Sequence, residues 1–170
     1  RYHIPVHMDG ARLFNAAAAG PLSAREIAAM VDSVQICLSK GLCAPVGSLL
    51  VGSAEMIRIA RRKRKILGGG MRQAGILAAA GLIALRDHRE RLAIDHENAR
   101  WLAEQLSRYP DRFELIRQPS INMVFFRLKN FPLPADDLAD YLAGKNVLIN
   151  GHDEGIFRVV THYWVSRQDL

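Results

Sequence analysis

Short apolar runs alternate with helical patterns along the first half of the chain, and this alternation constrains the fold more than any other feature. The runs have the length of strands. They lie at residues 2–9, 34–38 and 49–52, and the helical patterns lie at 13–19, 23–30 and 53–67. Strands that alternate with helices are typical of an α/β unit, in which ligands bind at the carboxyl ends of the strands.

The second half of the chain follows a different pattern. After three glycines at 68–70, we expect a helix of small residues over 71–85, a long amphipathic helix over 86–109, strands at 113–116, 122–129, 146–149 and 157–164, and a helix at 134–145. Neighbouring strands are typical of an α+β unit. We therefore predict that 1–86 is part of a large α/β domain, 87–108 a connecting helix and 109–170 a small α+β domain.

Composition limits the class of protein. The chain has 170 residues, of which 49% are hydrophobic and 24% are charged, as in a soluble globular protein. No apolar run is long enough to span a membrane, and the start does not resemble a signal peptide. The spacing of Cys37 and Cys43 fits no zinc pattern, so we expect thiols in a reducing, cytoplasmic compartment and no metal site.

Much of the net charge of +6 comes from residues 58–67, RIARRKRKIL. Such a cluster occurs in nucleic-acid-binding surfaces. Here Ser53 can cap a helix, Glu55 lies in its first turn, and the cations fall in its last turns, which complements the helix dipole. We therefore favour a solvated helix end and expect no nucleic-acid partner, with a binding module built on this helix as the alternative.

Two charged residues follow apolar runs where the edge of the sheet is expected. Asp9 ends the run at 2–9, and Lys40 follows the run at 34–38. Lysine is rarely buried, so its place between two apolar runs needs a reason. An amine there could attack a carbonyl, and a nearby carboxylate could hold a protonated pyridine nitrogen, as pyridoxal phosphate requires. A simple ion pair is the alternative.

Four stretches, HMDGARLFNA, CLSKGLCAPVGSLLVG, GGGMRQAGILAAAGL and FRVVTHYWVS, resemble in this order the motifs of the low-specificity L-threonine aldolases. These enzymes belong to the β-eliminating lyase group of fold-type I pyridoxal-phosphate enzymes. The resemblance extends from His7 to Ser166. It implies an α/β fold of the fold-type I PLP-dependent transferase class, with part of the large domain and its mixed sheet followed by the small α+β domain.

The resemblance also implies roles for individual residues. Lys40 resembles the lysine that forms a Schiff base with pyridoxal phosphate, which would explain its place between two apolar runs. Asp9 resembles the carboxylate that keeps the pyridine nitrogen protonated. Ala11 would lie against one face of the ring, and the backbone at Gly41 and Gly47 would let the chain pass close to the cofactor.

Three arginines complete the implied site. Arg12 and Arg158 resemble a pair that binds the substrate carboxylate, a task that suits the forked guanidinium group. Arg72 resembles an arginine that reaches the cofactor phosphate of a neighbouring subunit, so the resemblance implies a homodimer or homotetramer. A structural ion pair is the alternative role for Arg72.

Two histidines and one cysteine are also close to these motifs. His7 is expected on the same strand face as Asp9, either supporting the site or in the core. His162 is expected to have a structural role. Cys43 stands where the family usually has glycine, a departure that concerns the geometry of the loop rather than the chemistry.

The implied reaction is a retro-aldol cleavage. L-Threonine, L-allo-threonine or a related β-hydroxy-α-amino acid would give glycine and an aldehyde, and another β-eliminating lyase of the same fold is the alternative. The family places a large N-terminal portion before the strand that carries Asp9. Because that portion would supply the phosphate-binding loop and the hydroxyl base, we expect residues 1–170 alone to bind the cofactor poorly and to be inactive.

Overall fold

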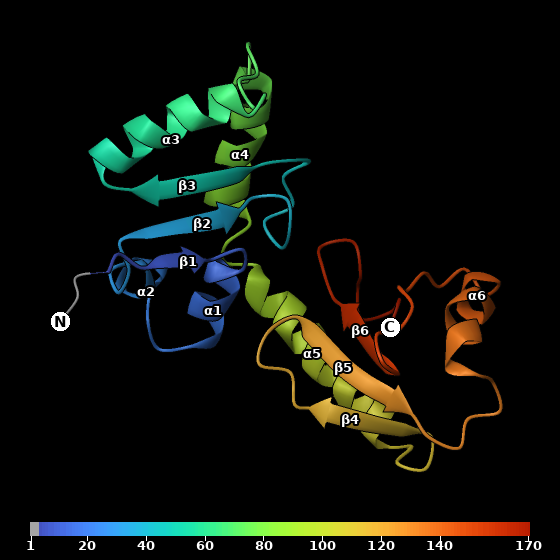
Figure 1. The fold of residues 1–170 in the computed structure, drawn as a ribbon. Coiled ribbons are helices and arrows are strands. Elements are labelled where there is room, and N and C mark those ends of the chain that lie inside the picture. The colour runs from blue at the N-terminus through green and yellow to red at the C-terminus, as the bar shows by residue number, and fades with distance from the viewer. Residues whose placement is uncertain (1–3) are drawn as a thin grey trace. The chain divides into compact units, whose positions relative to one another are not determined.

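The computed structural model describes residues 4–170, which form two compact units (Figure 1). The first unit ends at Leu92, and the second spans Ala93–Leu170. None of the described helices is long and apolar enough to cross a membrane. The strand expected over 2–9 begins outside the described residues, and its described part is a strand only at His7–Asp9.

The first unit is built on a three-stranded mixed sheet in the order β1-β2-β3. Its elements are β1 (His7–Asp9), α1 (Leu13–Ala19), α2 (Ala24–Ala28), β2 (Ser33–Cys37), β3 (Ser48–Gly52), α3 (Ala54–Ile66) and α4 (Gly75–Asp87). β1 runs parallel to β2, with Asp9 opposite Gln35, and β3 runs antiparallel to β2. The expected alternation of strands and helices is confirmed.

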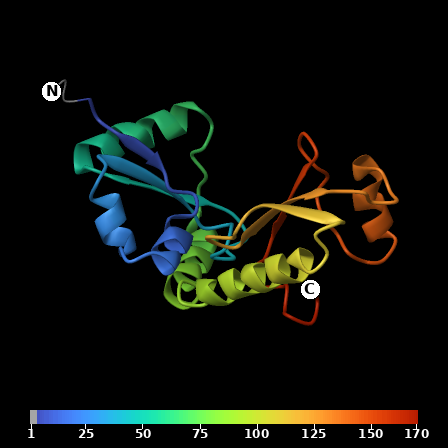
Figure 2. The ribbon, with the colours of Figure 1, turned by 90° about the horizontal axis from the view of Figure 1, so that it is seen from below.

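The two faces of this sheet differ in composition. Val34 and Ile36, and Leu38 just beyond the strand, are buried on one face with residues of α1, α2 and α4. Figure 2 shows these three helices on one side of the sheet and α3 on the other. On the second face, side chains from all three strands form a polar row whose members are exposed or half-buried. These residues are His7, Asp9, Ser33, Gln35, Cys37 and Ser48.

Local signals set the starts of α2 and α3 in this unit. Ser23 and Glu26 form the expected capping box, and the Ser53 hydroxyl accepts a hydrogen bond from the Met56 backbone N–H at 3.2 Å. The helix expected from residue 71 begins instead at Gly75. Gln73 has a φ of 51°, a left-handed conformation that a right-handed helix cannot include.

The second unit packs two helices on one face of an antiparallel sheet in the order β4-β5-β6. Its elements are α5 (Leu92–Ser107), β4 (Phe113–Arg117), β5 (Met123–Leu128), a 3-10 turn (Ala135–Asp137), α6 (Leu138–Ala143) and β6 (Ile156–Val160). Ala99 and Ala103 of α5 pack on Val124, while Phe126, Phe157 and Leu138 of α6 form a second cluster. The expected α+β unit is confirmed.

Three expectations for this unit are wrong in detail. The long helix begins at Leu92 rather than at 86, and β6 ends at Val160 rather than at 164. Residues 146–149 are not a strand, because Asn146 has a φ of 61° and the chain after it has no partner strand among residues 4–170. The division into 1–86, 87–108 and 109–170 as domains of a larger subunit stays a prediction.

His96 on α5 is a buried titratable group within the second unit. Burial lowers the pKa of His96, the charge of Arg100 lowers it further, and Asp95 acts in the opposite direction. Because the folded state binds this proton more weakly than the unfolded chain does, protonation favours unfolding.

We expect the free energy of unfolding of the second unit to fall as the pH drops through about 6.5, the ordinary histidine pKa. Urea denaturation at a series of pH values measures this effect. His96→Gln removes the titrating group and should flatten the dependence. An equally steep loss of stability in His96→Gln would contradict the assignment.

Candidate active site

Asp9 and Lys40 lie at one edge of the first sheet. Asp9 is the last residue of β1, and Lys40 follows the end of the parallel strand β2 by three residues. The carboxyl ends of adjacent parallel strands meet at the same edge, which is where open α/β sheets bind ligands. Both residues are exposed, and the structure of residues 4–170 contains no ion pair between them. The alternative of a simple ion pair is therefore not observed.

The turn after β1 fixes the Asp9 carboxylate. Asp9 Oδ1 accepts a hydrogen bond from the Ala11 backbone N–H at 3.1 Å. This contact anchors one oxygen of the carboxylate, so the second oxygen is the one that can accept a further proton donor. Arg12 follows directly and precedes the first residue of α1. Ala11 and Arg12, both half-buried, thus adjoin the acidic strand end, as the sequence predicts.

The loop that carries Lys40 is held by its own backbone. Leu38 donates to the carbonyl oxygen of Gly47 and accepts from Ala44, and the Lys40 carbonyl oxygen accepts from Cys43 at 2.9 Å. Cys43 has a φ of 62°, a left-handed conformation that explains why glycine suits this position. Cys43 therefore keeps the turn at the cost of backbone strain.

Gly41 has a packing role that the sequence does not indicate. A Cβ atom at this position would lie 2.7 Å from Leu92 Cδ2 and 3.3 Å from Asn15 Oδ1. The close approach at Gly41 is therefore to neighbouring protein atoms, and its approach to the cofactor stays a prediction. Gly47, with a φ of 118°, is needed for its backbone conformation.

Cys37 lies beside these charged groups on the polar row. Burial raises the pKa of its thiol, but hydrogen bonds from Gln35 Nε2 at 3.2 Å and Ser48 Oγ at 3.8 Å, together with the charge of Lys40, lower the pKa by more. Asp9 acts in the opposite direction. The pKa of the Cys37 thiol therefore depends on the charges of both predicted catalytic groups, Lys40 and Asp9.

This sensitivity gives a measurable prediction. Lys40→Met should raise the pKa of Cys37 and slow its alkylation by iodoacetamide near neutral pH, because thiolate is the reactive form. Asp9→Asn should lower the pKa and speed alkylation. Rates measured against pH in a Cys43→Ser background test both signs, with Lys65→Met on α3 as the matched control. Equal rates in all three variants would contradict the proximity of these charges.

His7 and Arg72 are the other predicted residues near these motifs in the first unit. His7 is exposed, with Nδ1 2.9 Å from Ser33 Oγ, so it ties β1 to β2 on the face of Asp9 and is not a core residue. Arg72 is exposed in the segment between α3 and α4. No ion pair involves Arg72 among residues 4–170, so the alternative of a structural ion pair is not observed.

Arg158 lies in the second unit, on the edge strand β6. It is exposed and lines a cavity of about 590 Å³ together with Asn146, Asn150 and His162. His162 Nδ1 accepts a hydrogen bond from the Trp164 backbone N–H at 3.3 Å, in keeping with a structural role. The cavity holds polar groups beside apolar ones, as ligand sites do.

Buried hydrogen bonds fix the chain next to Arg158. Thr161 Oγ1 donates to the Asp95 carbonyl oxygen at 2.6 Å, and Asn122 Nδ2 donates to the Thr161 carbonyl oxygen at 2.7 Å. Asn98 Nδ2 donates to the Val165 carbonyl oxygen at 3.1 Å. These bonds tie the chain directly after β6 to α5 and to the residue that precedes β5.

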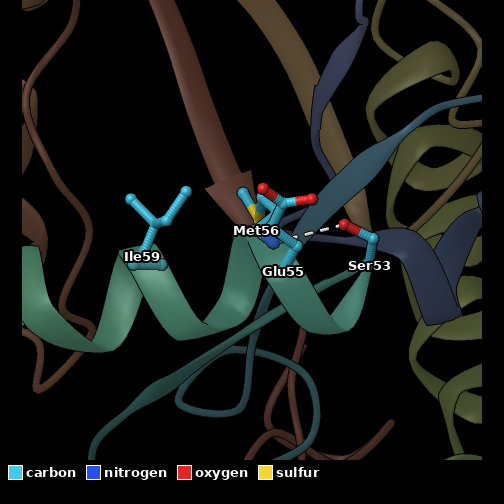
Figure 3. A pocket seen from close by; sticks show the side chains of 5 residues that line it. Ser53, Glu55, Met56 and Ile59 are labelled. Carbon is cyan, nitrogen blue, oxygen red and sulfur yellow. Dashed lines mark hydrogen bonds between the residues drawn. The ribbon is translucent and has the colours of Figure 1, made fainter.

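A second pocket, of about 340 Å³, lies over the first turns of α3 (Figure 3). It is lined by Ser53, Glu55, Met56, Ile59 and Ala60, and the hydrogen bond drawn there is the helix cap of Ser53. The pocket contains none of the predicted site residues. Ordinary helix capping accounts for its polar contact.

The basic cluster forms the end of α3, as the sequence predicts. Lys63, Arg64 and Lys65 lie in the last turn, where cations complement the helix dipole. A Cβ atom at Gly69 would lie 3.0 Å from Arg64 Cγ, and one at Gly70 would lie 2.9 Å from Lys65 Cδ. The stems of two cations therefore pack on the glycine segment. No group of three or more metal-ligating side chains occurs among the described residues.

A sequence profile for the β-eliminating lyases matches residues 1–130, more than half of the chain. The chain belongs to the β-eliminating lyase family. The low-specificity L-threonine aldolase of Escherichia coli strain K12 is 49% identical over 168 residues, which are 99% of this chain and 48% of that protein. The low-specificity L-threonine aldolase 1 of Arabidopsis thaliana is 39% identical over 171 residues, 100% of this chain and 48% of that protein.

Solved structures share the fold of this chain. A putative L-allo-threonine aldolase from Listeria monocytogenes has a TM-score of 0.79 at 22% identity. The match covers 94% of this chain and 46% of that protein's chain. A putative aromatic amino acid beta-eliminating lyase/threonine aldolase from Exiguobacterium has a TM-score of 0.76 at 26% identity. The match covers 94% of this chain and 47% of that protein's chain. The expected fold-type I class is confirmed, and the chain spans about half the length of the relatives it matches.

Proposed function

We propose that this chain carries the lysine, the carboxylate and the substrate-binding arginines of a PLP-dependent L-threonine aldolase. The enzyme cleaves L-threonine, L-allo-threonine and related β-hydroxy-α-amino acids to glycine and an aldehyde. The observation that carries the proposal is the placement of Asp9 and Lys40 at adjacent ends of parallel strands, with no ion pair between them among residues 4–170. The 49% identity to a low-specificity L-threonine aldolase supports the substrate class.

The residues at this strand edge fit pyridoxal phosphate. Lys40 offers a primary amine to the aldehyde carbon. Asp9 has one oxygen fixed by the Ala11 N–H, which leaves the other to accept the proton of a ring nitrogen. The small side chain of Ala11 leaves space beside a flat ring. When bound, the cofactor supplies an electron sink for the carbanion formed at the substrate Cα.

The chain's own groups then have distinct tasks. A negative charge on Asp9 would keep the ring nitrogen protonated. Arg12 and Arg158 bind the substrate carboxylate, and this fixes which bond at Cα is aligned for cleavage. The Cα–Cβ bond breaks as the β-hydroxyl loses its proton, the aldehyde leaves, and Cα gains a proton to give glycine.

Assembly and location are part of the same proposal. Arg72, exposed beside the glycine segment, would reach the cofactor phosphate of a neighbouring subunit, as the family resemblance implies. The enzyme would therefore be a homodimer or homotetramer, and it would act in the cytoplasm. Arg72→Ala should weaken cofactor retention only in the assembled oligomer.

Product analysis tests the proposed reaction against other lyases of the fold. With L-threonine and pyridoxal phosphate, we expect the enzyme to form glycine and acetaldehyde in equal amounts. Pyruvate and ammonia from L-serine or L-cysteine, without glycine from L-threonine, would instead identify a β-eliminating activity and overturn the proposal. Arg158→Gln should raise the KM for L-threonine, since it removes half of the carboxylate pair.

A further inference from the structure

The open face of the second sheet carries a row of three side chains, one from each strand. Arg117 of β4 is paired with Phe125 of β5, and Phe125 is paired with Arg158 of β6. Residues paired directly across strands have Cβ atoms about 5 Å apart on the same face. The Cβ atom of Phe125 therefore lies between those of two arginines, one of which belongs to the proposed substrate site.

A β-bulge puts Arg117 in this row. The register of β4 shifts between Leu115 and Arg117, so that Leu115 pairs with Phe126 and Arg117 pairs with Phe125. Without the extra residue, the alternation of a strand would put Arg117 on the core face with Leu115. Bulges often serve to re-aim a side chain near a functional site.

Arg117 stacks on the aromatic ring of Phe125. Its Cζ atom lies 4.3 Å from the centroid of Phe125, within the range of a cation–π contact. Arg158 makes no such contact with the ring among the described residues and instead lines the 590 Å³ cavity. Of the two arginines that pair with Phe125, only Arg117 is therefore stacked on the ring.

We propose that Arg117 is a positioning residue for Arg158: it stacks on the ring of Phe125 and so leaves the Arg158 guanidinium available to the substrate carboxylate. The proposal rests on the carboxylate-binding role proposed above for Arg158. An exposed guanidinium gains from stacking on an aromatic ring. Without Arg117, the Phe125 ring would compete with the substrate carboxylate for the Arg158 guanidinium. Arg117 prevents this competition because it is stacked on the ring itself.

The first test is kinetic and uses the PLP-loaded enzyme. Arg117→Ala frees the ring, and we expect the KM for L-threonine to rise about two- to fivefold with kcat unchanged, the equivalent of one exposed cation–π contact. Adding Phe125→Leu removes the ring and should return the KM to its original value. Arg117→Lys keeps a cation on the ring and should have little effect.

Arg127→Ala is the matched control. Arg127 lies on the same open face, but its guanidinium is 3.6 Å from Glu114 rather than on Phe125. Its removal subtracts the same charge from the face without freeing the ring. A KM that rises equally in Arg127→Ala and Arg117→Ala would assign the effect to net charge and overturn the positioning role.

The second test needs no catalysis. The Nε–Hε resonance of Arg158 in a proton–nitrogen correlation spectrum should move upfield in Arg117→Ala, because the guanidinium then lies over the ring. It should return in the double variant with Phe125→Leu. An unmoved resonance in Arg117→Ala would overturn the proposal.

Arg158→Gln distinguishes failure of the carboxylate-binding role of Arg158 from failure of the positioning role of Arg117. If this variant leaves the KM unchanged, the carboxylate role of Arg158 fails and the positioning role fails with it. If Arg158→Gln raises the KM while Arg117→Ala does not, only the positioning role fails.

Discussion

Replacing Lys40 by alanine should abolish turnover of L-threonine. The Lys40 amine is the group at this strand edge that can form a Schiff base with an aldehyde, and loss of a covalent nucleophile lowers kcat by about 10³-fold or more. The same change should remove the absorbance band at about 420 nm that the cofactor gives when bound to a lysine. A spectrum taken after desalting, with and without Lys40, measures this directly.

Two variants separate the amine of Lys40 from its charge. Lys40→Arg keeps a cation beside Cys37, but a guanidinium group stays protonated and so cannot offer a free amine. We expect it to be as inactive as Lys40→Ala while it preserves the alkylation rate of Cys37. Lys145→Ala, at an exposed position in the second unit, is the matched control and should retain both band and activity. A band that persists in Lys40→Ala would assign the covalent bond to another lysine.

Sequence patterns predict the strand ends of the first unit well because local signals and topology agree there. Ser23 with Glu26 and Ser53 give the helix starts, and the carboxyl ends of parallel strands place Asp9 near Lys40 without further information. The packing of Gly41 under Leu92 could not be foreseen. That contact joins residues far apart in the chain, and a glycine carries no sign of which neighbour requires it.

The second unit shows where sequence patterns fail. Residues 146–149 are apolar enough for a strand, but strand formation depends on a partner, and none pairs with them among residues 4–170. The bulge beside Arg117 is equally hidden, since simple alternation would turn that side chain to the core. The polar row that includes Gln35 and Cys37 was missed, although polar residues at every second position of an apolar run were the available signal.

Replacing Asp9 by asparagine should impair the reaction without unfolding the turn. The asparagine carbonyl oxygen can still accept the Ala11 N–H, so the local contact is retained while the negative charge is lost. Without that charge the ring nitrogen no longer keeps its proton, and the electron sink is weakened. We expect kcat to fall by about 10²- to 10⁴-fold, the range for loss of a positioned acid or base, with a smaller rise in KM.

Asp9→Glu and His7→Ala complete the test of the charge at this position. Asp9→Glu restores the charge on a longer side chain and should recover part of the lost kcat. For a purely structural role the order would be reversed, because asparagine keeps the Ala11 contact whereas the added methylene disturbs it. His7→Ala removes a neighbour on the same face that is bonded to Ser33 rather than to Asp9, and it should leave kcat within a few-fold of the original. If Asp9→Asn retains full kcat, the ring nitrogen does not depend on this carboxylate, and the proposed role of Asp9 is wrong even where that of Lys40 holds.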